Sequence, residues 1–291
     1  MHRSPRAANL AMLTLAIGFG AATSAGTSAE ERWSKITTDH FTILTPASEA
    51  VARTWTVELE EFRRGLQHLV PVAAGRVRPV TVVLFRQDRA MEPYLPREKG
   101  HPARLGGLFV RANDVNTIML SLARDAAETR RVIFHEAAHW HFSALDGAMP
   151  LWLGEGLAEL YATFQLLEGS RYSFGAAIPE HVRQLQHTRL LPLAQLLSID
   201  RESLLYNEGT RATIFYAESW AFVHYLFHGE NSPGRGSVAR YLKLLEAGRG
   251  AEDAFREGFG GNYAALEEQV RRYVRSGRYH THIYKRAAPG W

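Results

Sequence analysis

Two histidines and a downstream glutamate have the types and the spacing of a metal site. The segment VIFHEAAH at residues 132–139 places His135 and His139 four positions apart, and Glu155 follows in the segment LWLGEGLAE at residues 151–159. Residues four apart on a helix are offset by only about 40° around its axis, so both imidazoles would project from one face. The pair is therefore predicted to hold a single metal ion.

Zinc fits this donor set, because it binds imidazole nitrogens and carboxylate oxygens. Catalytic zinc sites use three protein ligands and keep the fourth position for water. Glu155 is the natural third ligand, and Glu136, directly after the first histidine, would lie near that water as a general base. The sequence thus predicts one Zn²⁺ ion bound by His135, His139 and Glu155, with Glu136 as the base.

The elements that must position these residues are two helices joined by a short loop. Residues 129–145 have the periodicity of an amphipathic helix, and the Gly and Pro within residues 146–150 end it and admit a second one. Because the loop is short, the helices should be antiparallel neighbours, which would bring Glu155 back toward the histidines. Glu159, one turn later, would then accept the second N–H of a ligand imidazole. The alternative for Glu159 is an exposed helix carboxylate.

Strand patterns dominate before the metal helix, and helical patterns dominate after it. Residues 38–122 are predicted to form a small, mostly antiparallel sheet with one helix across it, and the chain beyond residue 177 is mainly helical. The expected fold class is α+β, with an N-terminal sheet-containing subdomain at 30–125, a helical zinc-binding subdomain at 126–280, and a tail at 281–291 without interpretable periodicity. The expected strands are 40–44, 79–85, 107–111 and 117–122, with a hairpin or extended loop at 169–177, and the other expected helices are 48–69, 179–186, 193–197, 213–228, 238–246, 251–259 and 263–273.

Residues 1–25 are predicted to be a secretory signal peptide. Two arginines precede an apolar run at residues 10–22, and small residues then allow cleavage after Ala25 or Ala29. The run is short for a bilayer span, and retention as an uncleaved anchor is the alternative. The protein is therefore expected to be exported, to the periplasm or the extracellular space, with no stable membrane span once the signal is removed.

The composition is that of a globular protein without disulfides. The chain has no cysteine, 46% apolar residues and 22% charged residues, so packing or metal must hold the fold. It carries 34 Lys and Arg against 30 Asp and Glu, and loss of the two signal arginines brings it close to neutral. The densest basic group alternates with apolar residues, as a solvated helix face does; it consists of Arg271, Arg272, Arg275 and Arg278. Nucleic acid is therefore not expected as a partner.

The two metal-site segments together resemble the motif pair of the gluzincin metallopeptidases. HEAAH at residues 135–139 and WLGEGLAE at residues 152–159 are similar to the H-E-x-x-H and W-L-x-E-G motifs of the aminopeptidase N type and of the bacterial peptidase-MA-like domains. In that family the two motif histidines and the E-G glutamate bind zinc, and the motif glutamate is the base. The resemblance therefore implies the same ligands and base as the spacing does, within a thermolysin-like catalytic domain. The gap before Glu155 is a few residues shorter than in aminopeptidase N.

Two further features are implied by the resemblance. The segment YAESWAFVHYL at residues 216–226 looks like the helix that opens with the family's catalytic tyrosine, so Tyr216 would donate its phenol to the oxyanion. Tyr206 and His224 are the alternatives for this role. The family also has an edge strand that pairs with an extended peptide, and residues 107–109 are the candidate for it. The aminopeptidase signature G-A-M-E-N is absent from the sequence, so exopeptidase activity is not implied.

The expected function is that of a secreted zinc metallopeptidase, a hydrolase whose substrate is a peptide or protein. In the expected mechanism Glu136 takes a proton from the zinc-activated water as it attacks the peptide carbonyl, and then passes that proton to the leaving amine. Two alternatives stay open: a non-catalytic zinc-containing domain that binds peptides or envelope partners, and a zinc hydrolase of another bond type. A structural zinc site is normally closed by a fourth protein ligand. His141, the nearest candidate for that ligand, should face the far side of its helix.

Overall fold

The structure is a computed structural model of the 291-residue chain. It describes residues 31–70, 72, 77–98, 100–103, 105–112, 115–145, 149–207, 209–261 and 263–285. From Arg32 onward the chain forms one compact unit. The predicted signal peptide at residues 1–25 and both predicted cleavage positions lie outside the described residues.

A five-stranded mixed sheet forms the N-terminal part, in the order β1-β2-β3-β7-β6. The β1–β2 and β6–β7 pairs are antiparallel, but the β2–β3 and β3–β7 pairs are parallel. The prediction of a mostly antiparallel sheet is therefore wrong. Helix α1 connects β2 to β3, and a helical crossover of this kind brings the chain back in the same direction. The elements are β1 (Ser34–Thr37), β2 (Phe41–Thr45), α1 (Glu49–Leu69), β3 (Val80–Phe85), β6 (Gly107–Arg111) and β7 (Asn116–Ser121).

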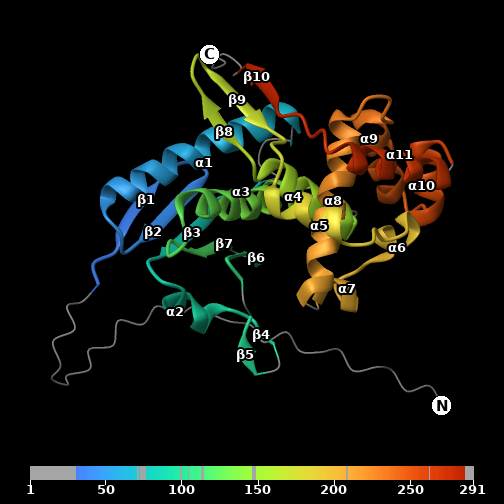
Figure 1. Ribbon diagram of the computed structural model, residues 1–291. Coiled ribbons are helices and arrows are strands. Elements are labelled where there is room, and N and C mark those ends of the chain that lie inside the picture. Colours follow the sequence, from blue (N-terminus) through green and yellow to red (C-terminus); the bar gives the residue numbers. More distant parts are fainter. Residues whose placement is uncertain are drawn as a thin grey trace. The chain divides into compact units, whose positions relative to one another are not determined.

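Helices α1 and α3 (Ala126–Phe142) both cover one face of this sheet (Figure 1). Alternate strand residues such as Val80, Val82 and Ile118 are buried beneath them. The opposite face carries a smaller cluster of Phe85, Met91 and Met119, formed where α2 packs on the sheet. The remaining elements on this side are α2 (Asp88–Met91), the 3-10 helix η1 (Glu92–Tyr94) and the short strands β4 (Arg97–Glu98) and β5 (His101–Pro102).

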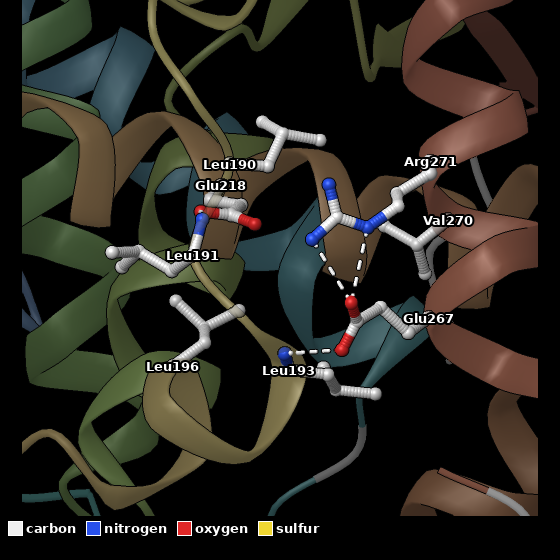
Figure 2. Close-up of a pocket in the computed structure, with 8 residues that line it drawn as sticks. All are labelled: Leu190, Leu191, Leu193, Leu196, Glu218, Glu267, Val270 and Arg271. Atoms are coloured by element: carbon white, nitrogen blue, oxygen red, sulfur yellow. Dashed lines mark hydrogen bonds and ion pairs between the residues drawn. The ribbon is translucent and has the colours of Figure 1, made fainter. Parts of the chain in front are cut away.

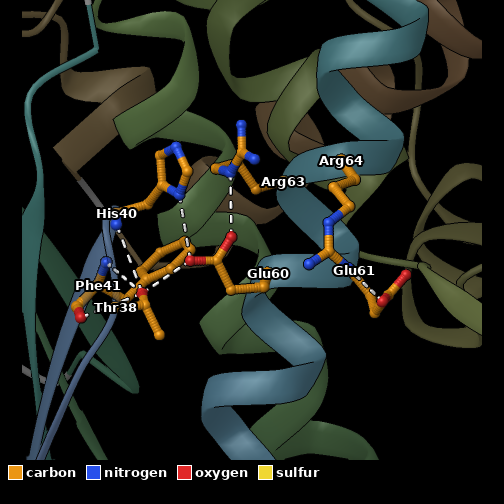
Figure 3. Close-up of polar contacts among 7 residues, drawn as sticks. All are labelled: Thr38, His40, Phe41, Glu60, Glu61, Arg63 and Arg64. Carbon is orange, nitrogen blue, oxygen red and sulfur yellow. Dashed lines mark hydrogen bonds and ion pairs between the residues drawn. The ribbon is translucent and has the colours of Figure 1, made fainter. Parts of the chain in front are cut away.

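Polar contacts fix the start of this sheet to α1 (Figure 3). Glu60 of α1 accepts hydrogen bonds from the Thr38 hydroxyl at 2.7 Å and from Arg63 at 3.2 Å, and it lies 3.2 Å from the His40 ring. Burial acts to raise the pKa of Glu60, but the hydrogen bonds from Thr38 and Arg63 outweigh it, so the net shift is downward. The carboxylate thus ties the β1–β2 turn to the helix.

Helix α8 is the centre of the helical part and packs against α4, α5 and α9. From Ile214 to Leu226 every residue except Tyr216 is buried, as expected of a helix surrounded by others. At Gly156 of α4 an added Cβ would lie 2.4 Å from the Ser219 carbonyl oxygen, so only glycine allows the two backbones to approach this closely. The helices are α4 (Leu151–Tyr161), α5 (Pro179–His187), α6 (Leu193–Ser198), α7 (Leu204–Asn207), α8 (Gly209–His228), α9 (Gly234–Glu246), α10 (Ala251–Phe259) and α11 (Tyr263–Ser276). Across the described residues, every helix falls short of the combined length and apolarity that a bilayer crossing demands.

One hydrophobic core runs through both of the predicted subdomains. Phe62 of α1 stacks on Phe134 of α3 with ring centroids 4.8 Å apart, and both rings meet Phe164 edge to face. Phe174 joins the same group. These aromatic contacts hold α3, which carries the histidine pair, at a fixed position between the sheet and the helices.

The predicted tail at 281–291 contains a strand. Strand β10 (His282–Lys285) pairs antiparallel with β9 (Arg171–Phe174), which also pairs with β8 (Gln165–Leu167). The His282 ring stacks on His228 of α8 with centroids 3.8 Å apart. One turn earlier, His224 lies 2.9 Å from the Gly175 carbonyl through Nε2 and 2.7 Å from the Tyr273 hydroxyl through Nδ1. Residues 286–291 of the tail lie outside the described residues.

This histidine cluster (His224, His228 and His282) should destabilise the fold in acid. Burial lowers the pKa of His224 to about 4 and of His228 to about 2, and it also lowers the pKa of His282, with Arg235 and His280 adding positive charge nearby. Each ring is therefore neutral when folded and protonates near pH 6.5 only when unfolded, so stability is lost as the pH falls below 6.5. His224 alone, which is fully buried, should cost about 2 kcal/mol at pH 5.

Urea unfolding at pH 7 and pH 5 would test this prediction. Exchange of both stacked rings for glutamine, in His228→Gln/His282→Gln, should reduce the loss between the two pH values by about 1 kcal/mol, a figure discounted because both rings are partly exposed. His101→Gln, at an exposed position of β5 outside this cluster, is the control and should lose as much as the parent. An equal loss in all three proteins would contradict the prediction.

Candidate metal centre

Helix α3 presents the histidine pair on its half-buried face. The helix begins at Ala126, where the Asp125 carboxylate accepts the amides of Ala127 and Glu128, both at 2.9 Å. Because of this cap, the helix begins three residues before residue 129, where the sequence predicted its start. The apolar positions 133, 134, 137 and 138 are buried, which leaves His135 and His139 together at the edge of the core.

Helix α4 brings two carboxylates to the same place. Pro150 starts this helix, and its carbonyl accepts the amides of Leu153 and Gly154. Glu155 and Glu159, one turn apart, are both only 6% exposed. Carboxylates are rarely buried this deeply unless cations or hydrogen-bond donors surround them. Helix α4 therefore presents two buried carboxylates where it contacts α3.

The three predicted ligands lie together and are close enough to hold one metal ion. Nε2 of His135 and Nε2 of His139 are 3.0 Å apart, and Oε2 of Glu155 lies 3.5 Å from the first and 3.3 Å from the second. Three ligands at about 2.0–2.1 Å from a tetrahedral ion are separated by about 3.3–3.4 Å, so the observed triangle matches. Oε2 of Glu155 is also buried without a hydrogen-bond partner. A metal ion would satisfy this orphaned oxygen.

The electrostatics of the site favour charged carboxylates. Burial acts to raise the pKa of Glu155, but the charges of His139 and His135 outweigh it and lower that pKa to about 2. Glu159 responds in the same way, since His135 and His181 hold its pKa well below the usual value against burial. Burial would lower the pKa of His135, but the Glu159 carboxylate raises it well above 6.5. The site therefore favours positive charge next to the two buried carboxylates, Glu155 and Glu159.

Glu136, the residue after His135, contacts the edge of the sheet. Its Oε2 accepts the Phe109 amide of β6 at 2.8 Å, and β6 is the last strand in the order of the sheet. At Gly107 an added Cβ would lie 2.6 Å from Val132 and 3.2 Å from Cγ of Glu136, so glycine allows the strand to lie directly on α3 here. Strand β6, which was predicted at 107–111, therefore fixes the Glu136 carboxylate through the Phe109 amide.

Glu159 has partners on two other helices, α3 and α5. Its Oε1 lies 3.3 Å from Nδ1 of His135, and its Oε2 lies 3.1 Å from Nε2 of His181 and 3.5 Å from Nη1 of Arg131. The alternative of an exposed helix carboxylate is wrong, because Glu159 is buried at the contact of α4 with α3 and lies against His181 of α5. Sequence reasoning missed His181 and Arg131, since neither belongs to a motif. A histidine in the first turn of an amphipathic helix was the only available signal for His181.

The three candidates for the oxyanion donor occupy different places. The Tyr206 hydroxyl donates to Oε1 of Glu155 at 3.4 Å, and the phenols of Tyr206 and Tyr216 are hydrogen-bonded to each other. Burial, followed by the charge of Glu155, raises the pKa of Tyr216 far above its usual value, so this phenol keeps its proton. His224 is engaged with Gly175 and Tyr273 instead. Both tyrosines thus belong to the surroundings of Glu155, and His224 does not.

His141 is also outside the ligand group. Its Nε2 lies 3.0 Å from the Val70 carbonyl, and burial lowers its pKa. This position agrees with the prediction that His141 faces the far side of α3. It does not supply a fourth ligand.

A small cavity between α6, α8 and α11 is a separate feature (Figure 2). Glu218 accepts the Leu191 amide at 2.9 Å, and Glu267 accepts the Leu193 amide at 2.8 Å while it pairs with Arg271. Burial raises the pKa of Glu218 to about 8. These acids bind backbone amides of the segment that starts α6, which is a structural role. The cavity shares no residue with the metal-ligand group.

Comparison with known proteins adds a family without an assigned activity. No curated protein matched the chain. A family model described as "Protein of unknown function (DUF1570)" matches residues 131–240. The matched segment contains the three candidate ligands, Glu136, Glu159, His181 and both tyrosines, and it ends before the C-terminal strand. The chain is therefore similar, over the segment that carries the candidate metal centre, to the DUF1570 family.

Proposed function

We propose that this protein is an exported zinc-dependent metallopeptidase of the gluzincin type, with a thermolysin-like catalytic domain. The observation that carries the proposal is the triangle of Nε2 of His135, Nε2 of His139 and Oε2 of Glu155, with sides of 3.0–3.5 Å. A donor set of two imidazoles and one carboxylate is typical of catalytic rather than structural zinc. The carboxylate of Glu136 beside this triangle, together with the H-E-x-x-H sequence, supports a hydrolytic role.

Each residue of the site would have its own role in the hydrolysis of a peptide bond. Zinc bound there supplies a Lewis acid that activates water and polarises the carbonyl. Glu136, oriented by the Phe109 amide, accepts a proton from the attacking water through its other oxygen and then donates it to the leaving amine. Tyr216 or Tyr206 donates a phenolic hydrogen bond to the oxygen that becomes negative.

A peptide is the favoured substrate because of the strand that adjoins Glu136. Among the described residues no strand pairs with the outer side of β6. Such an edge can take an extended peptide as an additional strand through backbone hydrogen bonds. A peptide in that position would lie along α3, with its carbonyl carbon near Glu136. The proposal therefore includes internal segments of extended polypeptides as substrates.

The test is digestion of an unstructured peptide library by the purified chain with one equivalent of zinc. We expect cleavage that stops when a chelator removes the metal and returns when zinc is added back. A chain that binds zinc but leaves every peptide intact would favour the non-catalytic binding domain. Hydrolysis of ester substrates in the same assay, with peptides untouched, would instead favour a zinc hydrolase of another bond type.

Removal of one hydroxyl group at a time can show which of the two tyrosines is the oxyanion donor. Tyr216→Phe is expected to lower kcat by about 10²-fold or more with little change in KM, because an oxyanion donor acts only in the transition state. Tyr206→Phe is the matched variant, since it removes the same atom from the hydrogen-bonded neighbour. Measurement of kcat and KM for both variants on one peptide decides the role. A kcat loss confined to Tyr206→Phe would assign the donor to Tyr206.

A further inference from the structure

One of the two proposed histidine ligands, His135, has a buried carboxylate next to its second ring nitrogen. Nδ1 of His135 lies 3.3 Å from Oε1 of Glu159, a carboxylate buried with its helix α4. Donation from Nδ1–H to this oxygen fixes the tautomer in which Nε2 has a free lone pair directed at His139 and Glu155. The position of His135 therefore depends on how firmly Glu159 itself is held.

Glu159 is held through its other oxygen. Oε2 accepts a hydrogen bond from Nη1 of Arg131 at 3.5 Å, and Nε2 of His181 lies nearer, at 3.1 Å, in an ion-pair contact. A buried carboxylate oxygen that loses its donor is costly, and the group rotates to find another. Without His181, Oε2 would keep only the longer contact with Arg131, and the carboxylate would be freer to rotate away from His135. The contact from His181 thus opposes this rotation.

His181 is well placed for this role because its own ring is fixed. It is the third residue of α5, 9% exposed, and its ring lies 5.7 Å from the ring of Trp220 on α8. Helix α5 packs along α8, whose residues 217–226 are all buried. His181 is therefore anchored by the core and reaches Glu159 from a third helix.

We propose that His181 is a positioning residue for the metal centre, which acts through Glu159 to set the ring orientation and tautomer of His135. This inference rests on the proposed zinc site. It assigns His181 no contact with substrate or metal. Loss of a partner that orients a ligand typically weakens metal binding by about 10–100-fold.

The experiment compares variants of the full chain by zinc affinity, measured in competition with a chromogenic chelator, and by the absorption spectrum of the Co²⁺-loaded protein. His181→Ala should bind zinc about 10–100-fold more weakly, with an altered Co²⁺ spectrum. His181→Gln, whose amide nitrogen can occupy the place of Nε2, should stay within about threefold of the parent. His181→Asn is shorter and should behave like the alanine variant, and it preserves a polar side chain if His181→Ala fails to fold.

His187 provides the matched control, because it is an exposed histidine at the other end of the same helix. His187→Ala should match the parent in zinc affinity and in the Co²⁺ spectrum. If the parent binds zinc and the alanine and asparagine variants match it in both measurements, the positioning role of His181 is wrong while the metal site stands. A parent that takes up no zinc would overturn the proposed function together with this inference.

Discussion

Replacement of Glu136 by glutamine is expected to reduce turnover by about 10²–10⁴-fold and to leave zinc affinity unchanged. Oε2 of Glu136 accepts the Phe109 amide at 2.8 Å, and the amide oxygen of glutamine can accept the same bond, so the side chain should stay in place. The glutamine cannot take a proton from water. Glu136 is also outside the group of three metal-binding donors, so the ion should still bind. Turnover and zinc affinity of this variant together therefore distinguish a role of Glu136 in proton transfer from a role in metal binding.

Single-turnover cleavage of a peptide and zinc content would be measured on the same preparation. Glu128→Gln is the control, because Glu128 lies on the same helix, has a partly exposed side chain and pairs with Arg124. That variant should match the parent in both measurements. Parental turnover by Glu136→Gln would remove the general base from the mechanism. A loss of zinc from Glu136→Gln would place Glu136 among the ligands instead.

The sequence was sufficient to predict that the three candidate ligands lie together, because their geometry is local. His135 and His139 share a face by helical periodicity alone, and the short connection to α4 limits where Glu155 can lie. The strands at 79–85 and 107–111 and the long helix at 48–69 were also predicted nearly to their observed ends. Each has a sustained hydrophobic period, which is the most reliable signal in a sequence.

Features that depend on distant packing could not be predicted. Alternation of apolar residues is the same in parallel and antiparallel strands, so the parallel pairing of β3 with β2 and β7 left no trace. Strands β1 and β10 have only four residues each, too few for a period to stand out. His181 meets Glu159 because α5 packs on α8, a contact that no spacing in the sequence encodes.

Glu155→Gln is expected to weaken zinc binding by more than the roughly 10–100-fold that loss of an orienting partner costs. Oε2 of Glu155 is the only carboxylate oxygen of the ligand group and lies within 3.5 Å of both Nε2 atoms. A glutamine keeps the size of the side chain but supplies a neutral and weaker ligand. Zinc at 100 times its Kd should raise the stability of the parent by about 2.7 kcal/mol, or about 5–10 °C in melting temperature. The Glu155→Gln protein should lose most of that response.

Glu159→Gln is the matched comparison, because it removes an equal charge from an equally buried position one turn further along α4. Both carboxylates lie beside His135, so general effects of charge removal on the fold should be similar. Only Glu155 would contact the ion, and its loss should therefore cost more zinc affinity than the loss of Glu159. Thermal melts with zinc and with chelator, and affinity by competition, would give both values. Equal losses in the two variants would mean that the carboxylates share one role, and the assignment of Glu155 as the third ligand would then be wrong.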